Sequence, residues 1–237
     1  MAAENTDPRS TTARVEPPIF ADRQDAGRRL ASALAATPLG DAVVVGLAWG
    51  GGPVAAEVAA RLAAPLDVAV VRKVGRPLQP ELALGAVTAA GQYYVAPIAE
   101  YEPAATLRAG FWAAVDKARQ MEGRLREEIP PVDLHGRACI LVDDGLATGA
   151  TMRAAIRWAR SRGAGRIVVA VPVAARESVS DLRDEADEVV CPHAVNELWA
   201  VGLWYRDFSQ VAEEEVLSLL RRSRASGPRP ARGAAMR

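Results

Sequence analysis

Short, almost continuously apolar runs alternate with segments of helical period along most of the chain. Such runs are expected of strands that are buried on both faces of a sheet. They lie at residues 41–48, 66–72, 137–143, 166–173 and, in a shorter form, 187–191. Strands that alternate with helices predict an α/β fold, in which a doubly wound, mostly parallel five-stranded sheet is connected by right-handed crossovers.

Two segments interrupt this alternation. Residues 81–97 alternate loosely between apolar and polar positions and contain Gly91, which predicts a hairpin that turns at this glycine. Residues 100–128 are rich in charge and precede Pro130 and Pro131, so they predict a long helix. We therefore expect the sheet to carry an inserted hairpin and a long helix.

Both ends of the chain lack an apolar period. Residues 1–18 are polar and contain proline, and residues 222–237 form a basic stretch rich in Gly, Pro and Ala. Such compositions cannot bury enough apolar surface to offset the entropy of ordering. We expect two disordered tails around one folded domain at residues 19–221.

Composition and apolar run lengths exclude several classes of protein. The formal net charge is zero and aromatic residues make up 5% of the chain, which argues against a nucleic-acid partner. With two cysteines, two histidines and no Cys/His cluster, a structural zinc site is not expected. No stretch approaches the roughly 18 apolar residues of a membrane span. We predict a cytoplasmic protein that does not contact membranes.

One segment carries the strongest chemical signal. Residues 139–151 read CILVDDGLATGAT. The predicted strand brings Asp143 and Asp144 to the carboxyl edge of the sheet, where open α/β sheets bind ligands. The two carboxylates point to different sides of the backbone, which suits two neighbouring hydroxyl groups better than a compact metal cage.

The residues that follow predict an anion site. They begin a helix, whose unpaired amides and dipole attract phosphate, and they comprise Ala147, Thr148, Gly149, Ala150 and Thr151. A phosphate site beside two hydroxyl acceptors matches ribose 5-phosphate. The alternative is an ordinary strand–turn–helix in which Asp144 acts only as a cap.

The string ILVDDGLATGAT resembles the signature of the type I phosphoribosyltransferases, which bind phosphoribosyl pyrophosphate (PRPP). The resemblance covers about residues 19–220 and includes FADRQDAGRRLASAL and AVGLWYRDFSQVAEEEV. These strings resemble a bacterial and archaeal branch that often stands alone and whose acceptor is not generally established. The resemblance implies the type I fold with a small hood region. It also implies Mg²⁺, a homodimer, and transfer of the phosphoribosyl group from PRPP to a nitrogenous, nucleobase-like acceptor with release of pyrophosphate.

The resemblance assigns the loop at residues 46–51 to pyrophosphate, with Gly50 and Gly51 offering backbone amides. Relatives commonly have an arginine where this chain has Trp49. Either nearby cations compensate for the missing arginine, or PRPP binding is weaker, or activity has been lost.

Three further basic residues are candidates for the same region. Arg72 and Lys73 match a basic pair that the superfamily places beside the leaving pyrophosphate, where positive charge would stabilise the developing anion. Arg76 is a candidate substitute for the missing arginine. The alternative for the basic pair is a solvated strand end.

The resemblance places acceptor recognition near residues 198–210. Trp204, Tyr205 and Phe208 are candidates to stack on a planar acceptor. Asp207 is a candidate to accept a hydrogen bond from ring nitrogens. Trp49 is a candidate to complete the pocket. The alternative for these aromatic residues is packing between the last strand and helix.

These assignments make Asp143, Asp144 and Lys73 the candidate catalytic residues. Mg²⁺ is expected to be held through PRPP oxygens, with the two aspartates as candidate further ligands rather than a protein cage. Two other functions stay open: a non-catalytic module that binds PRPP or a nucleotide, and a hydrolase that uses water as acceptor.

Overall fold

The computed structural model describes residues 18–226, with a parallel sheet at its centre. The strands follow the order β2-β1-β6-β7-β9, and every neighbouring pair is parallel. Their bounds are β1 (Ala42–Leu47), β2 (Leu66–Ala69), β6 (Ala138–Val142), β7 (Arg166–Ala170) and β9 (Glu188–Val190). The predicted α/β fold with a five-stranded parallel sheet is confirmed.

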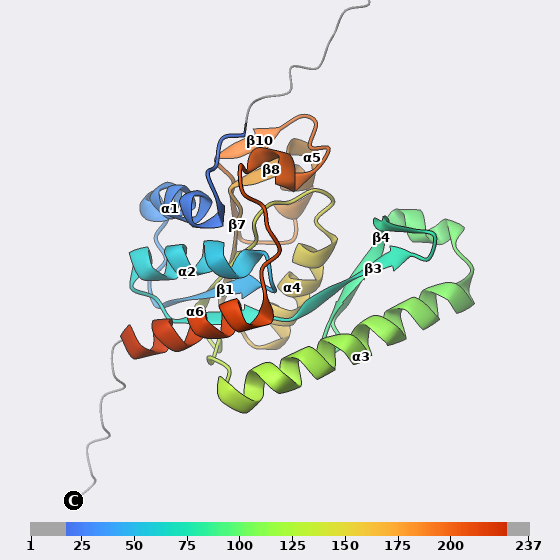
Figure 1. Cartoon of the computed structure of the whole chain (residues 1–237), viewed down its shortest axis with the longest axis horizontal. Helices are drawn as coiled ribbons and strands as arrows, with labels where there is room; N and C mark the ends of the chain where they lie inside the picture. Colours follow the sequence, from blue (N-terminus) through green and yellow to red (C-terminus); the bar gives the residue numbers. More distant parts are fainter. Residues whose placement is uncertain (1–17, 227–237) are drawn as a thin grey trace, which may run out of the picture.

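Helices cover both faces of this sheet (Figure 1). On one face lie α4 (Ala150–Ser161) and α5 (Arg176–Leu182), and on the other lie α1 (Arg23–Ala33), α2 (Gly51–Leu62) and α6 (Glu213–Ser226). Strand β6 shows why both faces are apolar. Its Cys139 and Leu141 pack into the core on the α4 side, whereas Ile140 and Val142 pack into the core on the α2 side.

An arm extends away from the sheet, as Figure 1 shows. It comprises β3 (Val71–Arg76), β4 (Gln79–Thr88), β5 (Tyr93–Val95), the short 3-10 helix η2 (Pro97–Tyr101) and α3 (Ala104–Glu128). The predicted turn lies between β4 and β5, where Gly91 has φ +94°. The inserted hairpin and long helix are therefore present.

The strand predicted at residues 66–72 was wrong in its extent. Strand β2 ends at Ala69, which pairs with the last residue of β1, Leu47. Beyond that point β1 offers no further partner. The chain instead continues as β3, which pairs antiparallel with β4 from Val71 onward. Arg72 and Lys73 thus lie in the arm and not at the carboxyl end of a strand of the central sheet.

A small hood lies above the sheet and contains elements that the apolar pattern did not predict. They are β8 (Val173–Ala175), β10 (His193–Val195) and the 3-10 helix η3 (Val201–Trp204). Phe20, at the start of the described chain, packs with Val173 and Tyr205 in the hood core. The N-terminal segment before α1 is thereby attached to the hood.

The C-terminal boundary also differs from the prediction. Helix α6 continues to Ser226, so residues 222–226 are helical, although we expected a disordered tail from residue 222. Arg222 donates to Ser218 and Arg224 donates to the Pro130 carbonyl, and these contacts lie within the extra turn. The tails predicted at residues 1–17 and 227–237 lie outside the described residues. Within the described part, no helix is long and apolar enough to cross a membrane.

Candidate active site

Asp143 and Asp144, the acidic pair, follow β6 at the carboxyl edge of the sheet. Because Gly46 of β1 pairs with Val142 of β6, the loops that follow these two strands leave the sheet side by side. The loop after β1 approaches the acidic pair so closely that it must contain glycine. A Cβ atom at Gly51 would lie 2.5 Å from the Val142 carbonyl oxygen and 3.1 Å from Asp143 Cα, and one at Gly50 would meet the Asp144 carboxylate.

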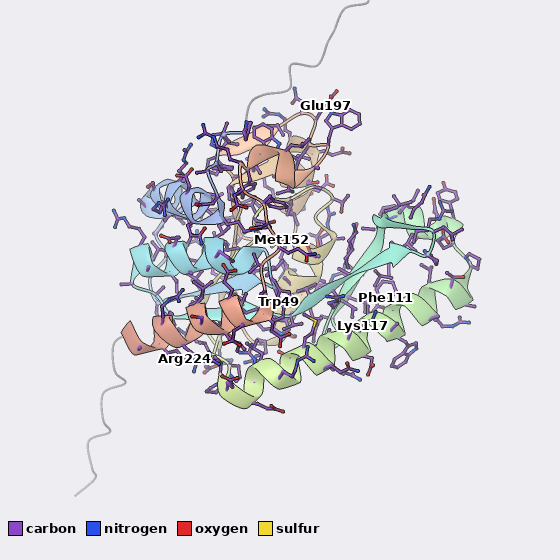
Figure 2. The ribbon with its side chains drawn as sticks, in the orientation of Figure 1. Trp49, Phe111, Lys117, Met152, Glu197 and Arg224 are labelled. Atoms are coloured by element: carbon purple, nitrogen blue, oxygen red, sulfur yellow. The ribbon has the colours of Figure 1, made fainter. Side chains whose placement is uncertain are left out.

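These two loops form one wall of a cavity of about 440 Å³. Residues of α1 and of the segment before α6 complete it, and the lining comprises Arg23, Trp49, Gly50, Asp143, Asp144, Phe208, Gln210 and Val211. Figure 2 shows Trp49 near the middle of the molecule, level with the base of the arm. The cavity therefore combines two carboxylates with a partly aromatic wall.

Arg23 of α1 forms an ion pair with Asp144. Its Nε donates to Asp144 Oδ2 at 2.9 Å, and its Nη1 donates to the Ser209 carbonyl at 2.7 Å. The guanidinium carbon lies 3.9 Å from the centre of the Phe208 ring. Sequence reasoning missed this residue, although it lies inside the FADRQDAGRRLASAL string, because 121 positions separate it from Asp144.

The loop between β6 and α4 is the candidate phosphate loop, residues 147–151. Gly149 has φ +73°, a left-handed conformation that favours glycine, and no side chain caps the helix that begins at Ala150. Thr148 is exposed and Thr151 is half-buried. The first amides of α4 are therefore available to an anion.

Two side chains that sequence reasoning did not single out support this loop from behind. Arg153 Nη1 donates to the Thr148 carbonyl at 3.1 Å, and Ser178 Oγ donates to the Ala147 carbonyl at 2.5 Å. Arg153 is itself held by ion pairs with Asp181 and Glu185. The carbonyls are thus satisfied inside the protein, which leaves the amide side of the loop for a ligand.

Comparison with known proteins identifies the family. A family model for the phosphoribosyl transferase domain matches residues 20–206. The chain belongs to the phosphoribosyl transferase domain family. The match spans the sheet, the arm, the hood and the candidate phosphate loop, and thus nearly all of the described fold.

Two relatives are similar to this phosphoribosyl transferase domain over most of its length. A Mycobacterium tuberculosis protein named "Putative phosphoribosyl transferase Rv0571c" is 44% identical over 211 residues, which are 86% of this chain and 47% of the relative. The crystal structure of TT1426 from Thermus thermophilus is 44% identical, has a TM-score of 0.72, and is matched over 85% of this chain and 97% of that one. The chain thus spans about half the length of the mycobacterial relative.

A third relative is similar over a shorter stretch. The uracil phosphoribosyltransferase of a Nocardioides species is 36% identical over 87 residues, which are 37% of this chain and 41% of that protein. This match is too short to describe the whole domain.

The acidic pair is electrostatically unusual in this phosphoribosyl transferase domain. Burial, and then the negative charge of Asp144, raises the pKa of Asp143 well above its ordinary value. Burial also raises the pKa of Asp144, although the Arg23 guanidinium partly offsets this effect. The hydroxyl of Tyr205 donates to the Asp144 carbonyl at 2.5 Å and so fixes its backbone. The site maintains two carboxylates in surroundings that disfavour their charge.

The three predicted basic residues of the arm do not line the cavity. Arg72 lies 3.7 Å from Met121 Sδ on α3, and Lys73 is exposed on β3 opposite Ala86. Arg76, near the tip of the β3–β4 hairpin, forms a 2.6 Å ion pair with Glu102. All three belong to β3, which leaves the central sheet after β2 and pairs with β4 instead.

The predicted aromatic residues divide into two groups. Tyr205 is only 4% exposed and packs between Phe20 and Phe208, and Trp204 packs against the same hood core. For these two residues the structure favours the packing alternative over stacking on a ligand. Trp49 and Phe208 instead line the cavity.

Asp207, the last of the predicted acceptor residues, is exposed and accepts a hydrogen bond from the Ser209 amide. Its carboxylate therefore shapes the turn that leads into the Phe208–Val211 wall. It is not among the residues that line the cavity.

The donor set fits Mg²⁺ only as an ion shared with a ligand. Among residues 18–226 no group of three or more His, Cys, Asp or Glu side chains could hold a metal. The acidic pair offers oxygen ligands, of which Asp144 Oδ2 already accepts from Arg23. Mg²⁺ is commonly bound by one or two carboxylates together with phosphate oxygens and waters, and the acidic pair meets that requirement.

Proposed function

We propose that this chain transfers the 5-phosphoribosyl group from PRPP to a nitrogenous ring acceptor and releases pyrophosphate. The observation that carries this proposal is the position of the acidic pair. Asp143 and Asp144 lie between an uncapped helix N-terminus with Gly149 at φ +73° and a glycine loop that contacts Asp144. A sugar diol flanked by two phosphorylated positions matches this arrangement.

Each part of PRPP has a candidate partner in the chain. The 5-phosphate binds the amides and hydroxyls of the phosphate loop at residues 147–151. The ribose hydroxyls donate to Asp143 and Asp144. The pyrophosphate lies against the backbone of Gly50 and Gly51. Mg²⁺, when bound, supplies positive charge that neutralises the pyrophosphate oxygens.

The reaction requires positioning rather than a protein nucleophile. The bond between ribose C1 and the pyrophosphate oxygen breaks, and its electron pair leaves with pyrophosphate. The acceptor nitrogen forms the new bond to C1, and its proton passes to water. The chain contributes by holding donor and acceptor in line.

The acceptor is proposed to be a nucleobase-like ring. Trp49 and Phe208 give the cavity flat apolar surfaces, and Gln210 gives it an amide that can both donate and accept hydrogen bonds. The partial similarity to a uracil phosphoribosyltransferase supports this class of acceptor.

Pyrophosphate release tests the proposal. The protein is incubated with PRPP, Mg²⁺ and a panel of purine and pyrimidine bases, and released pyrophosphate is measured for each base. We expect release that depends on one base and is lost in the Asp143→Asn/Asp144→Asn double variant. Asp133→Asn, an exposed carboxylate before β6, is the matched control and should retain activity.

A second candidate, a non-catalytic PRPP-binding module, is favoured by two features. Asp144 is already paired with Arg23, and the glycine loop carries Trp49 in place of a basic residue. Tight PRPP binding without pyrophosphate release for any base would support this module. Release without any base would instead support a hydrolase.

A further inference from the structure

The cavity has an unusual distribution of charge for a site that receives a highly anionic donor. Asp143 and Asp144 contribute two carboxylates to its lining, and Arg23 is the single basic side chain among the lining residues. The glycine loop contributes no cation, because Gly50, beside the acidic pair, is preceded by Trp49 and followed by glycines. The positive side-chain charge of the cavity lining therefore comes from α1.

The guanidinium of Arg23 is held in one orientation. Its Nε bonds to Asp144, its Nη1 bonds to the Ser209 carbonyl, and its face lies on the Phe208 ring. The residue is only 9% exposed. Among the described residues, Nη2 makes no hydrogen bond of its own. A planar group fixed on two nitrogens, with a third nitrogen left over, is preorganised for a further acceptor.

Two other basic side chains are committed elsewhere. Arg153 is bonded to Thr148, Asp181 and Glu185 behind the phosphate loop. Arg76 is paired with Glu102 on the arm. Neither lines the cavity, so neither replaces Arg23 as a source of positive charge there.

We propose that Arg23 binds the pyrophosphate group of the donor, and so supplies from α1 the cation that the glycine loop lacks. This inference rests on the proposed function. As the C1–oxygen bond breaks and its electron pair moves to pyrophosphate, the guanidinium stabilises the charge that develops on the leaving group. The same guanidinium contacts the Phe208 ring and the Ser209 carbonyl, and so holds the Phe208–Val211 wall of the cavity beside the acidic pair. Arg23 therefore contributes both to donor binding and to the position of the wall that faces the acceptor.

Calorimetric titration with two probes tests this role. Inorganic pyrophosphate and PRPP, each with Mg²⁺, are titrated into the wild type, Arg23→Met, Arg23→Lys and the control Arg28→Met. Loss of a charge-assisted hydrogen bond typically lowers affinity about 10- to 100-fold, and we expect Arg23→Met to lose this much for both probes. Arg23→Lys keeps the charge and should recover part of the loss. Arg28, on the same helix with a 58% exposed side chain, should be neutral.

A second readout separates ligand contact from a structural role. Once the accepted base is known, Arg23→Lys should lower kcat more than it raises the KM of the base, because the leaving-group charge is greatest in the transition state. In nuclear magnetic resonance spectra of the wild type, the Arg23 Nε–H signal, assigned by its loss in Arg23→Lys, should shift when pyrophosphate is added. This measurement does not require Arg23→Met to fold.

Three outcomes would overturn the inference: equal affinity of Arg23→Met and wild type for both probes, tighter binding by Arg23→Met, or an unchanged Nε–H signal at saturating pyrophosphate. Tighter binding would mean that the Arg23 side chain blocks the anion site instead of binding the anion. If the wild type binds pyrophosphate through Arg23 but does not bind PRPP, the proposed function fails while the anion contact stands. If the wild type binds PRPP and Arg23→Met binds it equally, only the inference fails.

Discussion

Asp143 is a residue whose environment opposes its charged form. Burial and the neighbouring Asp144 raise its pKa well above the ordinary value, and the Asp144 amide, which donates to Asp143 Oδ1 at 2.9 Å, offsets only part of this rise. A raised folded-state pKa means that the folded protein binds the proton more tightly than the unfolded chain does. Stability therefore falls as pH rises from the unfolded pKa through the folded pKa, and the loss is complete above the folded pKa.

Asp143→Asn should consequently stabilise the ligand-free protein at pH 7.5 while weakening PRPP binding. The amide keeps an oxygen for the Asp144 N–H but removes the buried charge. We expect the free energy of unfolding to rise by about 1 kcal/mol, the size of many single stabilising substitutions at functional sites. Urea unfolding at pH 7.5 and pH 4 measures it, and the gain should shrink at pH 4 as Asp143 takes up its proton. A gain that is equal at both pH values, or a loss at pH 7.5, would contradict this account.

At the same scale, the residues that sequence reasoning found are those that one short segment brings together. Asp143, Asp144 and Gly149 follow one strand within a few positions, so a parallel sheet places them at its carboxyl edge whatever the rest of the chain does. Arg23 and Phe208 reach the acidic pair through tertiary packing of α1 and of the segment before α6. No local pattern encodes such a contact, which is why Arg23 was missed.

At the scale of elements, the junction between β6 and α4 depends on a left-handed backbone conformation. Gly149 has φ +73°, and a Cβ atom there would meet only ordinary contacts, at 3.6 Å or more. Gly149→Ala should therefore be destabilised by backbone strain, on the order of 1 kcal/mol, rather than by a clash. Because the strain displaces the amides of the phosphate loop, PRPP affinity should fall as well.

Gly136→Ala is the matched control for this prediction. Gly136 precedes β6, at the opposite edge of the sheet, with φ +71°, and a Cβ atom added there would have no other atom within 4 Å. The Gly136→Ala variant should lose about as much stability as Gly149→Ala in thermal unfolding, and its PRPP affinity in calorimetry should equal that of the wild type. Equal affinity losses in both variants would mean that general destabilisation, and not the loop, governs binding.

The extent of the elements was predictable where packing agrees with the local pattern. The strands buried on both faces were found because their apolar runs are continuous. The division of residues 66–76 into β2 and β3 was not found, because Val70 and Val71 continue the apolar run while the partner changes from β1 to β4. The short hood strands β8 and β10 were missed for a related reason: three residues cannot display a period.

At the scale of the whole molecule, most of the large apolar side chains that remain exposed lie in the arm, and the others are Trp199, Leu203 and Phe208. Its large exposed side chains are Leu78, Tyr93, Val95, Ile98, Tyr101 and Trp112. Helix α3 covers the arm strands on one side through the cluster that includes Val74 and Leu84. Figure 1 shows the far end of the arm extending beyond the sheet, and the six side chains are each at least 41% exposed in the described chain. Exposed apolar surface of this kind marks association sites.

The homodimer expected from the sequence should therefore form through the arm. Trp112 is 69% exposed and Tyr101 is 73% exposed, and replacing both with glutamate would place two charges in such an interface without disturbing the buried core. We expect wild-type protein to sediment as a dimer and the double variant as a monomer with an unchanged circular dichroism spectrum. Trp199→Glu, which replaces an 82% exposed tryptophan in the hood region, is the control and should remain dimeric. A monomeric wild type at micromolar concentration, or a double variant that still dimerises, would contradict this prediction, because burying two unpaired charges in an interface is costly.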